Sequence, residues 1–424
     1  MKLCAAALAV TLTAAAAPAF AQMAYAPDTA PAPGTTACPG GLCQPAALDG
    51  FFHALDGLKA GAAAPVHIVQ IGDSHTAGDQ ITGRLRAGLQ ARFGVAGRGA
   101  VPAGVPYGGY APYQLQVSAE GWVTEVAALR GPYATPTAVF GLGAVRGRGA
   151  PGSALVLTFE PGAEPRRLGV CGAALGDGDR PGLRVEGDGE PRHLDLTDHD
   201  GGDAACVHID LDRPAARLRL VQEGAGVVLD TVWTETLKPG VIVSNLGLTG
   251  STLRDLAGRD NRMLETELGT WGPALVVLAY GVNEGFEDGL NPVAYEALMR
   301  AQIERLRFDA PGASLLILGA PDAQRSGVAG GCSADGQRAP PPSLAVVRDV
   351  QKRVAADMGV AFWDWHGRMG GDCSADRLAT RAEPFMLRDR VHFSSAGADW
   401  IGGVLLDDLM AAYEAWRADN GTAG

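Results

Sequence analysis

Residues 66–75 read VHIVQIGDSH, and this stretch decides the fold that we expect. Its first six residues form a short apolar run that stops at Gly72, as a strand buried in a sheet would. Beyond it, apolar side chains recur every four residues from Ile81 to Phe93, which predicts a helix with one buried face. The stretch therefore predicts a strand, a polar loop and a helix.

The same alternation of strand and helix resumes much later in the chain. Four further apolar runs have the length of buried strands, at residues 241–244, 275–279, 314–318 and 360–363. Helical stretches with typical starting residues are found at 292–307, 343–358 and 395–416. Five strands that alternate with helices predict a parallel, doubly wound sheet.

Residues 114–238 break this alternation. They hold short apolar alternations separated by Gly and Pro, at 154–159, 207–211 and 216–221. We expect an all-β, sandwich-like domain here, inserted between the first and second strands. The α/β domain is then discontinuous and consists of residues 49–113 and 239–424.

Residues 1–21 have the features of a secretory signal peptide. Lys2 supplies the positive charge, an apolar stretch follows, and a small-x-small cleavage site ends at Ala21. A membrane anchor is the alternative, but the apolar run is short for a bilayer. We expect a periplasmic or secreted chain that begins near Gln22 with a flexible arm, residues 22–48, and has no transmembrane segment.

Six cysteines remain once the signal is removed. An even number in a chain bound for an oxidising compartment predicts disulfides. Several pairings are open, and proximity in the sequence favours Cys38–Cys43, Cys171–Cys206 and Cys332–Cys373. None of these cysteines has the paired spacing of a zinc site.

The formal net charge of -12 bears on possible partners. Binding a nucleic-acid backbone needs clustered Lys and Arg, so we expect no nucleic-acid partner. Residues 193–210 are rich in His and Asp, but their spacing matches no EF-hand or zinc pattern. We therefore predict no metal and no other cofactor.

Ser74 lies where the first predicted strand gives way to a loop and then a helix. This is the carboxyl edge of the sheet, where doubly wound folds open their active sites. A helix start there also favours a developing negative charge. The alternative is that Asp73 or Ser74 simply caps the helix, which is the commoner use of such residues.

Asp389 and His392 precede the last predicted helix. A serine hydroxyl becomes a nucleophile when a neutral imidazole takes its proton, and the imidazole needs a partner that fixes its tautomer. An Asp three residues before the His can be that partner if both lie on one turn. A surface loop with an incidental histidine is the alternative, and it weakens once Ser74 requires a distant base.

Two more segments follow predicted strands. Residues 278–284 read LAYGVNE, in which Asn283 has two amide donors for the oxygen of a tetrahedral intermediate. Residues 244–252 read SNLGLTGST, in which a glycine amide is another donor. Each segment also fits an ordinary βα turn. Together with the first two signals, they predict one shared crevice.

These four blocks resemble those of the SGNH, or GDSL, hydrolase superfamily, whose members carry serine, glycine, asparagine and histidine in this order. The resemblance covers both segments of the α/β domain and implies a three-layer α/β/α, flavodoxin-like sheet. It implies that Ser74 is the nucleophile and that Asp389 and His392 complete a catalytic triad.

By the same resemblance, Gly250 and Asn283 join the Ser74 amide in an oxyanion hole. Gly250 is preferred to Gly247 because family members place this glycine five residues after the asparagine that matches Asn245. Asp73 is read as a bonding partner within its own turn.

Two residues depart from the family pattern without removing a catalytic atom: His75 replaces the usual leucine, and Glu284 replaces a common aspartate. With the insert and the YGGY segment at 107–110, they resemble periplasmic peptidoglycan O-acetylesterases. In those enzymes a module similar to a carbohydrate-binding domain lies between the first two blocks, which implies a carbohydrate-binding-like role for the insert.

The resemblance implies a serine esterase that removes O-acetyl groups from peptidoglycan through an acetyl-enzyme, with acetylated glycan as its partner. A glycan O-acetyltransferase uses the same triad and differs in how well it excludes water. An esterase for another acylated polysaccharide or lipid is a second alternative. A non-catalytic wall-binding protein is a third.

Overall fold

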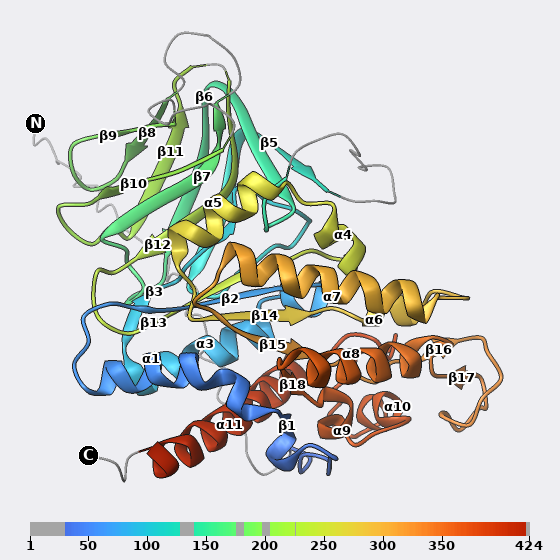
Figure 1. The fold of residues 1–424 in the computed structure, drawn as a ribbon. Coiled ribbons are helices and arrows are strands. Elements are labelled where there is room, and N and C mark those ends of the chain that lie inside the picture. Colours follow the sequence, from blue (N-terminus) through green and yellow to red (C-terminus); the bar gives the residue numbers. More distant parts are fainter. Residues whose placement is uncertain (1–29, 128–139, 175–181, 197–203, 225, 421–424) are drawn as a thin grey trace, which may run out of the picture.

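The computed structural model describes residues 30–127, 140–174, 182–196, 204–224 and 226–420. These residues form two large β-sheets and a two-stranded one. Figure 1 shows the antiparallel sheet at the top and the helix-covered, mainly parallel sheet below it. The five apolar runs predicted for the α/β domain are all strands of the mainly parallel sheet.

The seven-stranded sheet has the order β1-β18-β15-β14-β2-β13-β3, and only β1 runs antiparallel to its neighbour. Its strands are β1 (Leu42–Cys43), β2 (Val66–Gly72), β3 (Val95–Gly97), β13 (Val241–Gly247), β14 (Leu275–Ala279), β15 (Ser314–Leu318) and β18 (Ala361–Trp363). The strand order reverses at β2, which lies between β13 and β14. Doubly wound sheets bind ligands at this reversal point, outside the carboxyl ends of the strands.

Helices cover both faces of this sheet and complete three layers (Figure 1). One face carries α1 (Asp49–Lys59), α3 (Gln80–Phe93) and α11 (Ser395–Asn420), and the other carries α5 (Asn261–Trp271), α7 (Pro292–Asp309) and α8 (Leu344–Met358). Successive side chains of β2 point to opposite faces of the sheet. Ile68 therefore packs in the core with α1, α3 and α11, and Val69 packs in the core with α5, α7 and α8. The predicted fold class is confirmed.

Short helices occupy the loops of this domain. They are α2 (Ser74–Ala77), α4 (Leu253–Ala257), α6 (Val282–Gly285), α9 (Trp365–Met369) and α10 (Ser374–Ala379). A small hairpin pairs β16 (Arg325–Ser326) with β17 (Arg338–Ala339). The first three helices each follow the carboxyl end of a central strand, so the loops that carry the predicted site residues share one edge of the sheet.

The antiparallel sheet folds around a core of its own. Its strands are β4 (Val101–Pro102), β5 (Leu115–Val126), β6 (Val145–Phe159), β7 (Arg167–Ala174), β8 (Gly182–Glu186), β9 (Arg192–Asp195), β10 (Ala205–Asp210), β11 (Arg217–Gln222) and β12 (Val227–Glu235). Strands β10, β7 and β12 form one part of this sheet, and β6, β11, β8 and β9 continue it. Among the described residues, β12 and β6 are paired at Leu229 and Gly147. The short β4 pairs with β12 although it precedes the predicted insert. The limits at 114 and 238 stay a prediction.

All three predicted disulfides are present: Cys38–Cys43, Cys171–Cys206 and Cys332–Cys373. The second joins neighbouring strands β7 and β10, at positions that are directly paired. The third links the segment of the β16–β17 hairpin to the residue before α10. The first and third bonds therefore fix short or irregular segments, whereas the second links two regular strands.

The prediction of a flexible arm is wrong for residues 30–48. Leu42 and Leu48 are buried in the core beside α11, and β1 extends the sheet by pairing with β18. The carbonyl of Pro31 accepts a hydrogen bond from the Trp400 indole at 2.9 Å. Composition suggested a linker, but buried leucines and a local disulfide hold this segment on the domain. The predicted signal peptide and residues 22–29 lie outside the described residues.

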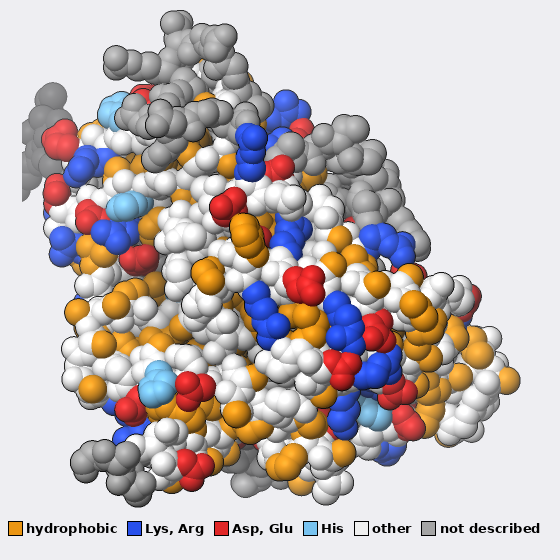
Figure 2. Space-filling view, viewed as in Figure 1, with side chains coloured by type: hydrophobic (Ala, Val, Ile, Leu, Met, Phe, Trp, Pro, Cys, Tyr) orange, Lys and Arg blue, Asp and Glu red, His pale blue; other side chains and the backbone are white. Residues whose placement is uncertain are grey.

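The surface over α7 and α8 is a mixed-charge one. Figure 2 shows acidic and basic side chains side by side there, and Glu296 accepts from Arg300 at 2.8 Å and from Arg353 at 2.5 Å. Ion pairs of this kind are usual on solvated helices and add little stability. Among the described residues we find no helix with the length and apolarity that crossing a bilayer needs.

Candidate active site

Ser74 is the first residue of α2 and follows the carboxyl end of β2. Asp73 caps this helix, since its Oδ1 accepts the backbone N–H of His75 at 2.9 Å. Glycine is required at Gly72 because a Cβ there would lie 2.6 Å from the carbonyl oxygen of Ala279 on β14. Strands β2 and β14 approach closely at this point. Ser74 lies just beyond, at the edge of the sheet, and is partly exposed.

The structure brings Ser74 and His392 together across 318 residues of sequence, with Ser74 Oγ 2.9 Å from His392 Nε2. On the other side of the ring, Nδ1 lies 2.7 Å from Oδ2 of Asp389. Because a carboxylate only accepts, Nδ1 carries the ring proton, and Nε2 turns its lone pair to the Ser74 hydroxyl. This is the arrangement in which a serine can lose its proton to an imidazole.

The loop around Asp389 fixes that carboxylate. Its Oδ1 accepts the backbone N–H groups of Val391 and His392 at 2.9 and 3.1 Å. Partial burial raises the pKa of Asp389, but these bonds and the one from the His392 ring outweigh burial and hold the pKa below its ordinary value. The carboxylate therefore stays ionised throughout the range in which an imidazole titrates.

The register of the parallel sheet puts the second and third blocks beside the first. Gly247 at the end of β13 and Ala279 at the end of β14 both lie opposite Gly72. The loops that leave these two strands therefore start on either side of the one that carries Ser74. The first three blocks therefore leave the sheet at one edge, whereas a single crevice shared by all four blocks stays a prediction.

Gly250 and Asn283 line one cavity of about 580 Å³ between these loops. Gly250 has a φ of +75°, which a residue with a side chain rarely adopts. One amide N–H of Asn283 donates to the carbonyl of Ser251 at 2.8 Å, which fixes the orientation of that amide. Ser74 and His392 line a separate cleft of about 720 Å³.

Asp79 is a buried carboxylate that accepts several hydrogen bonds, and sequence reasoning missed it. Its carboxylate accepts from Arg86 at 2.8 and 3.2 Å, from Arg98 at 3.0 Å and from the backbone N–H of Tyr113 at 2.9 Å. The amide of Asn245 donates to it at 3.0 Å, which links the second block to the loop after Ser74. Burial raises the pKa of Asp79, but the two arginines outweigh burial and lower it. Its φ of 52° was the kind of feature that no sequence pattern signals.

Glu284, one of the two departures from the family pattern, joins the second and third blocks. Its Oε1 accepts the backbone N–H of Leu253, the first residue of α4, at 2.7 Å. Burial raises the pKa of this carboxyl to about 7. The longer side chain therefore serves as a brace between the two loops that carry Gly250 and Asn283.

The cleft beside Ser74 is lined from both domains. Tyr107, Tyr110 and Tyr113 come from the segment that follows β4. Gln116 lies on β5, and Glu160 directly follows β6. The hydroxyl of Tyr107 donates to the carbonyl of Ala77 at 2.7 Å, so the tyrosine segment is tied to α2. Aromatic side chains with polar tips suit a ligand that has both apolar faces and hydroxyl groups.

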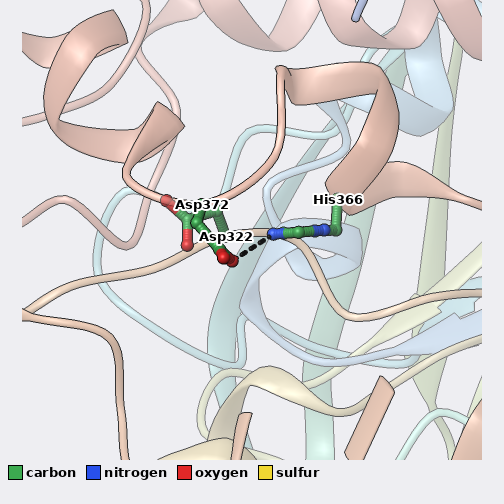
Figure 3. Close-up of side chains that lie close together, drawn as sticks. All are labelled: Asp322, His366 and Asp372. Carbon is green, nitrogen blue, oxygen red and sulfur yellow. Dashed lines mark hydrogen bonds and ion pairs between the residues drawn. The ribbon is translucent and has the colours of Figure 1, made fainter. Parts of the chain in front are cut away.

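Asp322, His366 and Asp372 could in principle hold a metal ion, since one ligand atom from each lies within 4.8 Å of the others. Figure 3 shows them converging, and His366 Nε2 lies 2.9 Å from Oδ1 of Asp372. However, Arg348 places a guanidinium 3.7 Å from the same oxygen and also acts on the charge of Asp322. Because this arginine already supplies the positive charge, we assign the cluster no metal.

The His- and Asp-rich segment 193–210 shows ordinary ion pairs where it is described. His193 Nδ1 lies 2.9 Å from Glu223, and Asp210 accepts from Arg167 at 2.7 Å. Residues 197–203 lie outside the described residues. These pairs involve His193 and Asp210, and the absence of a metal in this segment stays a prediction.

Comparison with known proteins finds a family model and a strong structural match. The model of the GDSL-like lipase/acylhydrolase family matches residues 220–400, which hold the second, third and fourth blocks. The solved structure of a peptidoglycan O-acetylesterase superposes with a TM-score of 0.74 and 26% identity, over 86% of this chain and 96% of that one. No curated protein sequence matches the chain.

Two other solved structures are only weakly similar to this chain. A family two carbohydrate esterase from Cellvibrio japonicus has a TM-score of 0.27 and 11% identity, over 74% of this chain and 98% of its own. A salicylyl-acyltransferase from a tetracycline biosynthetic pathway has a TM-score of 0.30 and 17% identity, over 74% and 96%. Residues 220–400 thus resemble the GDSL-like lipase/acylhydrolase family, the chain has the SGNH hydrolase fold, and the protein is a carboxylic ester hydrolase.

Proposed function

We propose that the protein is a serine esterase that removes O-acetyl groups from peptidoglycan, with Ser74 as nucleophile and His392, oriented by Asp389, as general base. The observation that carries this proposal is the chain of two short contacts from Ser74 Oγ through the His392 ring to Asp389. The substrate class is supported by the likeness to a peptidoglycan O-acetylesterase over 86% of the chain.

The proposed reaction passes through an acetyl-enzyme. His392 Nε2 takes the proton of the Ser74 hydroxyl while Oγ attacks the acetyl carbonyl carbon. The tetrahedral intermediate collapses, the sugar oxygen leaves, and the imidazolium of His392 gives it the proton. A water molecule, activated by the same nitrogen, then attacks the acetyl group and frees acetate and Ser74.

The oxyanion of each intermediate would be held by three N–H donors. Ser74 is the first residue of α2, so its backbone N–H has no acceptor within the helix. The Gly250 N–H lies in a turn with positive φ. Asn283 uses one amide N–H to reach Ser251 and has a second for the substrate oxygen. We propose these three groups as the oxyanion hole.

The Asn283→Ala variant should lower kcat by about 10²- to 10³-fold, because an oxyanion donor acts mainly in the transition state. KM for 4-nitrophenyl acetate should change much less. Asn261→Ala, on the exposed start of α5, is the matched control and should behave as the parent. Unchanged kcat in a folded Asn283→Ala variant would remove this residue from the oxyanion hole.

The glycan is proposed to occupy the cleft beside Ser74. Sugars present flat apolar faces and ring hydroxyls, and the cleft offers the tyrosines of residues 107–113 together with polar groups of the insert. We also propose a carbohydrate-binding-like role for residues 114–238, of which Gln116 and Glu160 line the same cleft. Export is part of the proposal: disulfides indicate an oxidising compartment, periplasmic or extracellular.

Incubation with O-acetylated peptidoglycan, followed by measurement of free acetate, tests the substrate. We expect acetate to appear with the parent chain and not with peptidoglycan that was first chemically de-O-acetylated. Release from acetylated xylan or lipid esters but not from peptidoglycan would contradict the substrate and leave the esterase. Acetylated acceptor sugar in place of free acetate would identify a transferase.

A further inference from the structure

His75 occupies a buried position between the two loops that form the Ser74–His392 contact. Its side chain is only 4% exposed. Its Nδ1 lies 3.1 Å from Oδ1 of Asp73, on its own loop. Its Nε2 lies 2.9 Å from the carbonyl oxygen of Val391, the residue before His392. The ring thus spans the serine loop and the histidine loop.

The two contacts fix the protonation of this ring. A backbone carbonyl can only accept, so Nε2 must carry a hydrogen. Asp73 Oδ1 already accepts the backbone N–H of His75 at 2.9 Å, so it acts as a carboxylate acceptor, and Nδ1 must donate to it as well. A ring that donates from both nitrogens is an imidazolium. Burial lowers the pKa of His75, but the charge and hydrogen bond of Asp73 and the bond to Val391 outweigh burial and raise it above 6.5.

The His75 ring is stacked against the ring of His392. Their centroids are 5.5 Å apart, with 28° between the planes. Trp365 and Phe393 meet the His75 ring edge-on at 5.4 and 5.9 Å, so its position is enclosed by aromatic groups. Any turn of the His75 ring would break both hydrogen bonds and disturb the neighbouring imidazole.

We propose that His75 is a positioning residue, held as an imidazolium, that ties the Ser74 loop to the His392 loop and sets how readily His392 accepts the Ser74 proton. The proposal rests on the proposed roles of Ser74 and His392. Leucine, usual at this position in the family, can fill the space but can make neither hydrogen bond nor carry charge. The departure from the pattern is therefore a functional one.

The charge should act on the pH dependence of the reaction. The charged or titratable groups around the His75 ring are Asp73 on the same loop and Asp389 and His392 on the facing loop. The aromatic neighbours Trp365 and Phe393 do not titrate. Beyond Asp73 lie Tyr280 and Glu284, whose pKa values its charge helps to raise. A positive ring beside His392 opposes a second positive charge there, and removing it relieves that repulsion.

The parent chain allows a direct test by ¹⁵N NMR with labelled histidine. We expect one histidine with both ring nitrogens protonated at pH 7.5, assigned to His75 because its signals disappear in His75→Gln. A neutral, singly protonated His75 at pH 7.5 would overturn the proposal. This measurement needs no activity, so it is independent of the proposed reaction.

The His75→Gln variant tests the effect on catalysis. Glutamine keeps a donor but not the charge, so kcat for 4-nitrophenyl acetate should fall about 10- to 100-fold, with KM little changed. The acid limb of the kcat/KM profile should move to higher pH by about one unit, since one like charge fewer faces His392. An unmoved acid limb in a folded variant would refute the electrostatic part of the proposal.

His67→Gln is the matched control. His67 is also a buried histidine with a hydrogen bond, to Ser244 at 2.6 Å, but it lies near the opposite end of β2. This variant should leave the acid limb in place. If the acid limb moved as far in His67→Gln as in His75→Gln, the effect would come from general disturbance of the fold, and the proposal would be overturned.

Stability gives a further readout with a definite sign. Because the pKa of His75 is raised in the folded chain, its ion pair stabilises fully below about pH 6.5, and the gain is lost as pH rises through the raised pKa. The difference in Tm between parent and His75→Gln should therefore shrink as pH increases. A difference that grows with pH would contradict a charged His75. If Ser74→Ala kept full activity, the proposed function would fail instead, whatever the state of His75.

Discussion

Replacing Ser74 with alanine is expected to lower kcat for 4-nitrophenyl acetate by about 10⁴- to 10⁶-fold, because no acetyl-enzyme can form without the hydroxyl. The substitution removes one oxygen from a partly exposed residue, so the fold should be unaffected. Residual hydrolysis should come only from binding and the oxyanion donors. Mass spectrometry of the parent, quenched during turnover, should find an added acetyl group on Ser74.

The Ser395→Ala variant is the control for this experiment. Ser395 is an exposed serine at the start of α11, and its hydroxyl only accepts a bond from Gln80 at 3.1 Å. It should retain parental activity. Equal activity in Ser74→Ala and the parent would remove Ser74 as nucleophile and, with it, the proposed mechanism.

The His392→Ala variant should lose activity to a similar degree, about 10⁴-fold or more, because the Ser74 hydroxyl then keeps its proton at neutral pH. Groups that act as one unit are not additive, so the double variant of Ser74 and His392 should be no worse than Ser74→Ala alone. Steady-state kinetics of the three variants at pH 8 measures both effects. A double variant that loses the product of the single losses would contradict a shared role.

Two further variants delimit the role of His392. His53→Ala replaces an exposed histidine of α1 and should have no effect. Asp389→Asn should fall between the parent and His392→Ala, because the amide can favour the wrong tautomer but the site is nearly half exposed to water. Full activity of Asp389→Asn would show that the negative charge of Asp389 is not needed, since the asparagine oxygen can still accept from Nδ1.

The sequence predicted the α/β domain well because its strands are fully buried. Runs such as 275–279 and 314–318 are apolar on both faces, and helices cover both faces of the sheet. The periodic helices were equally legible, since Ile81, Leu85 and Leu89 all pack in one core. Local pattern and tertiary environment agree in these elements, so either one reveals the fold.

The docked segment of residues 30–48 could not be predicted in the same way. Its only strand, β1, has two residues, and its contacts are with β18 and α11 at the far end of the chain. Composition rich in Ala, Pro and Gly resembles that of a linker. Only the tertiary contact of Leu42 and Leu48 distinguishes this segment from a free arm.

The residues of the candidate site also differ in how far the sequence could predict them. Ser74, Gly250 and Asn283 lie in motifs that follow strands, and Asp389 and His392 lie in a motif before the last described helix. The structure brings Ser74, His392 and Asp389 into contact, and Gly250 and Asn283 line a neighbouring cavity. The contacts of His75 and Asp79 were not predictable, since their partners are up to 316 residues away. Motifs name the groups that can react, whereas the groups that hold them depend on packing.

The contact between Ser74 and His392 also has a consequence for biosynthesis. The hydroxyl is synthesised early and its imidazole partner 318 residues later, close to the last helix. A nascent chain that ends before His392 contains the hydroxyl without its imidazole partner, whatever part of it has already folded. Ser74 therefore acquires this hydrogen-bond partner only after the chain has been synthesised through residue 392.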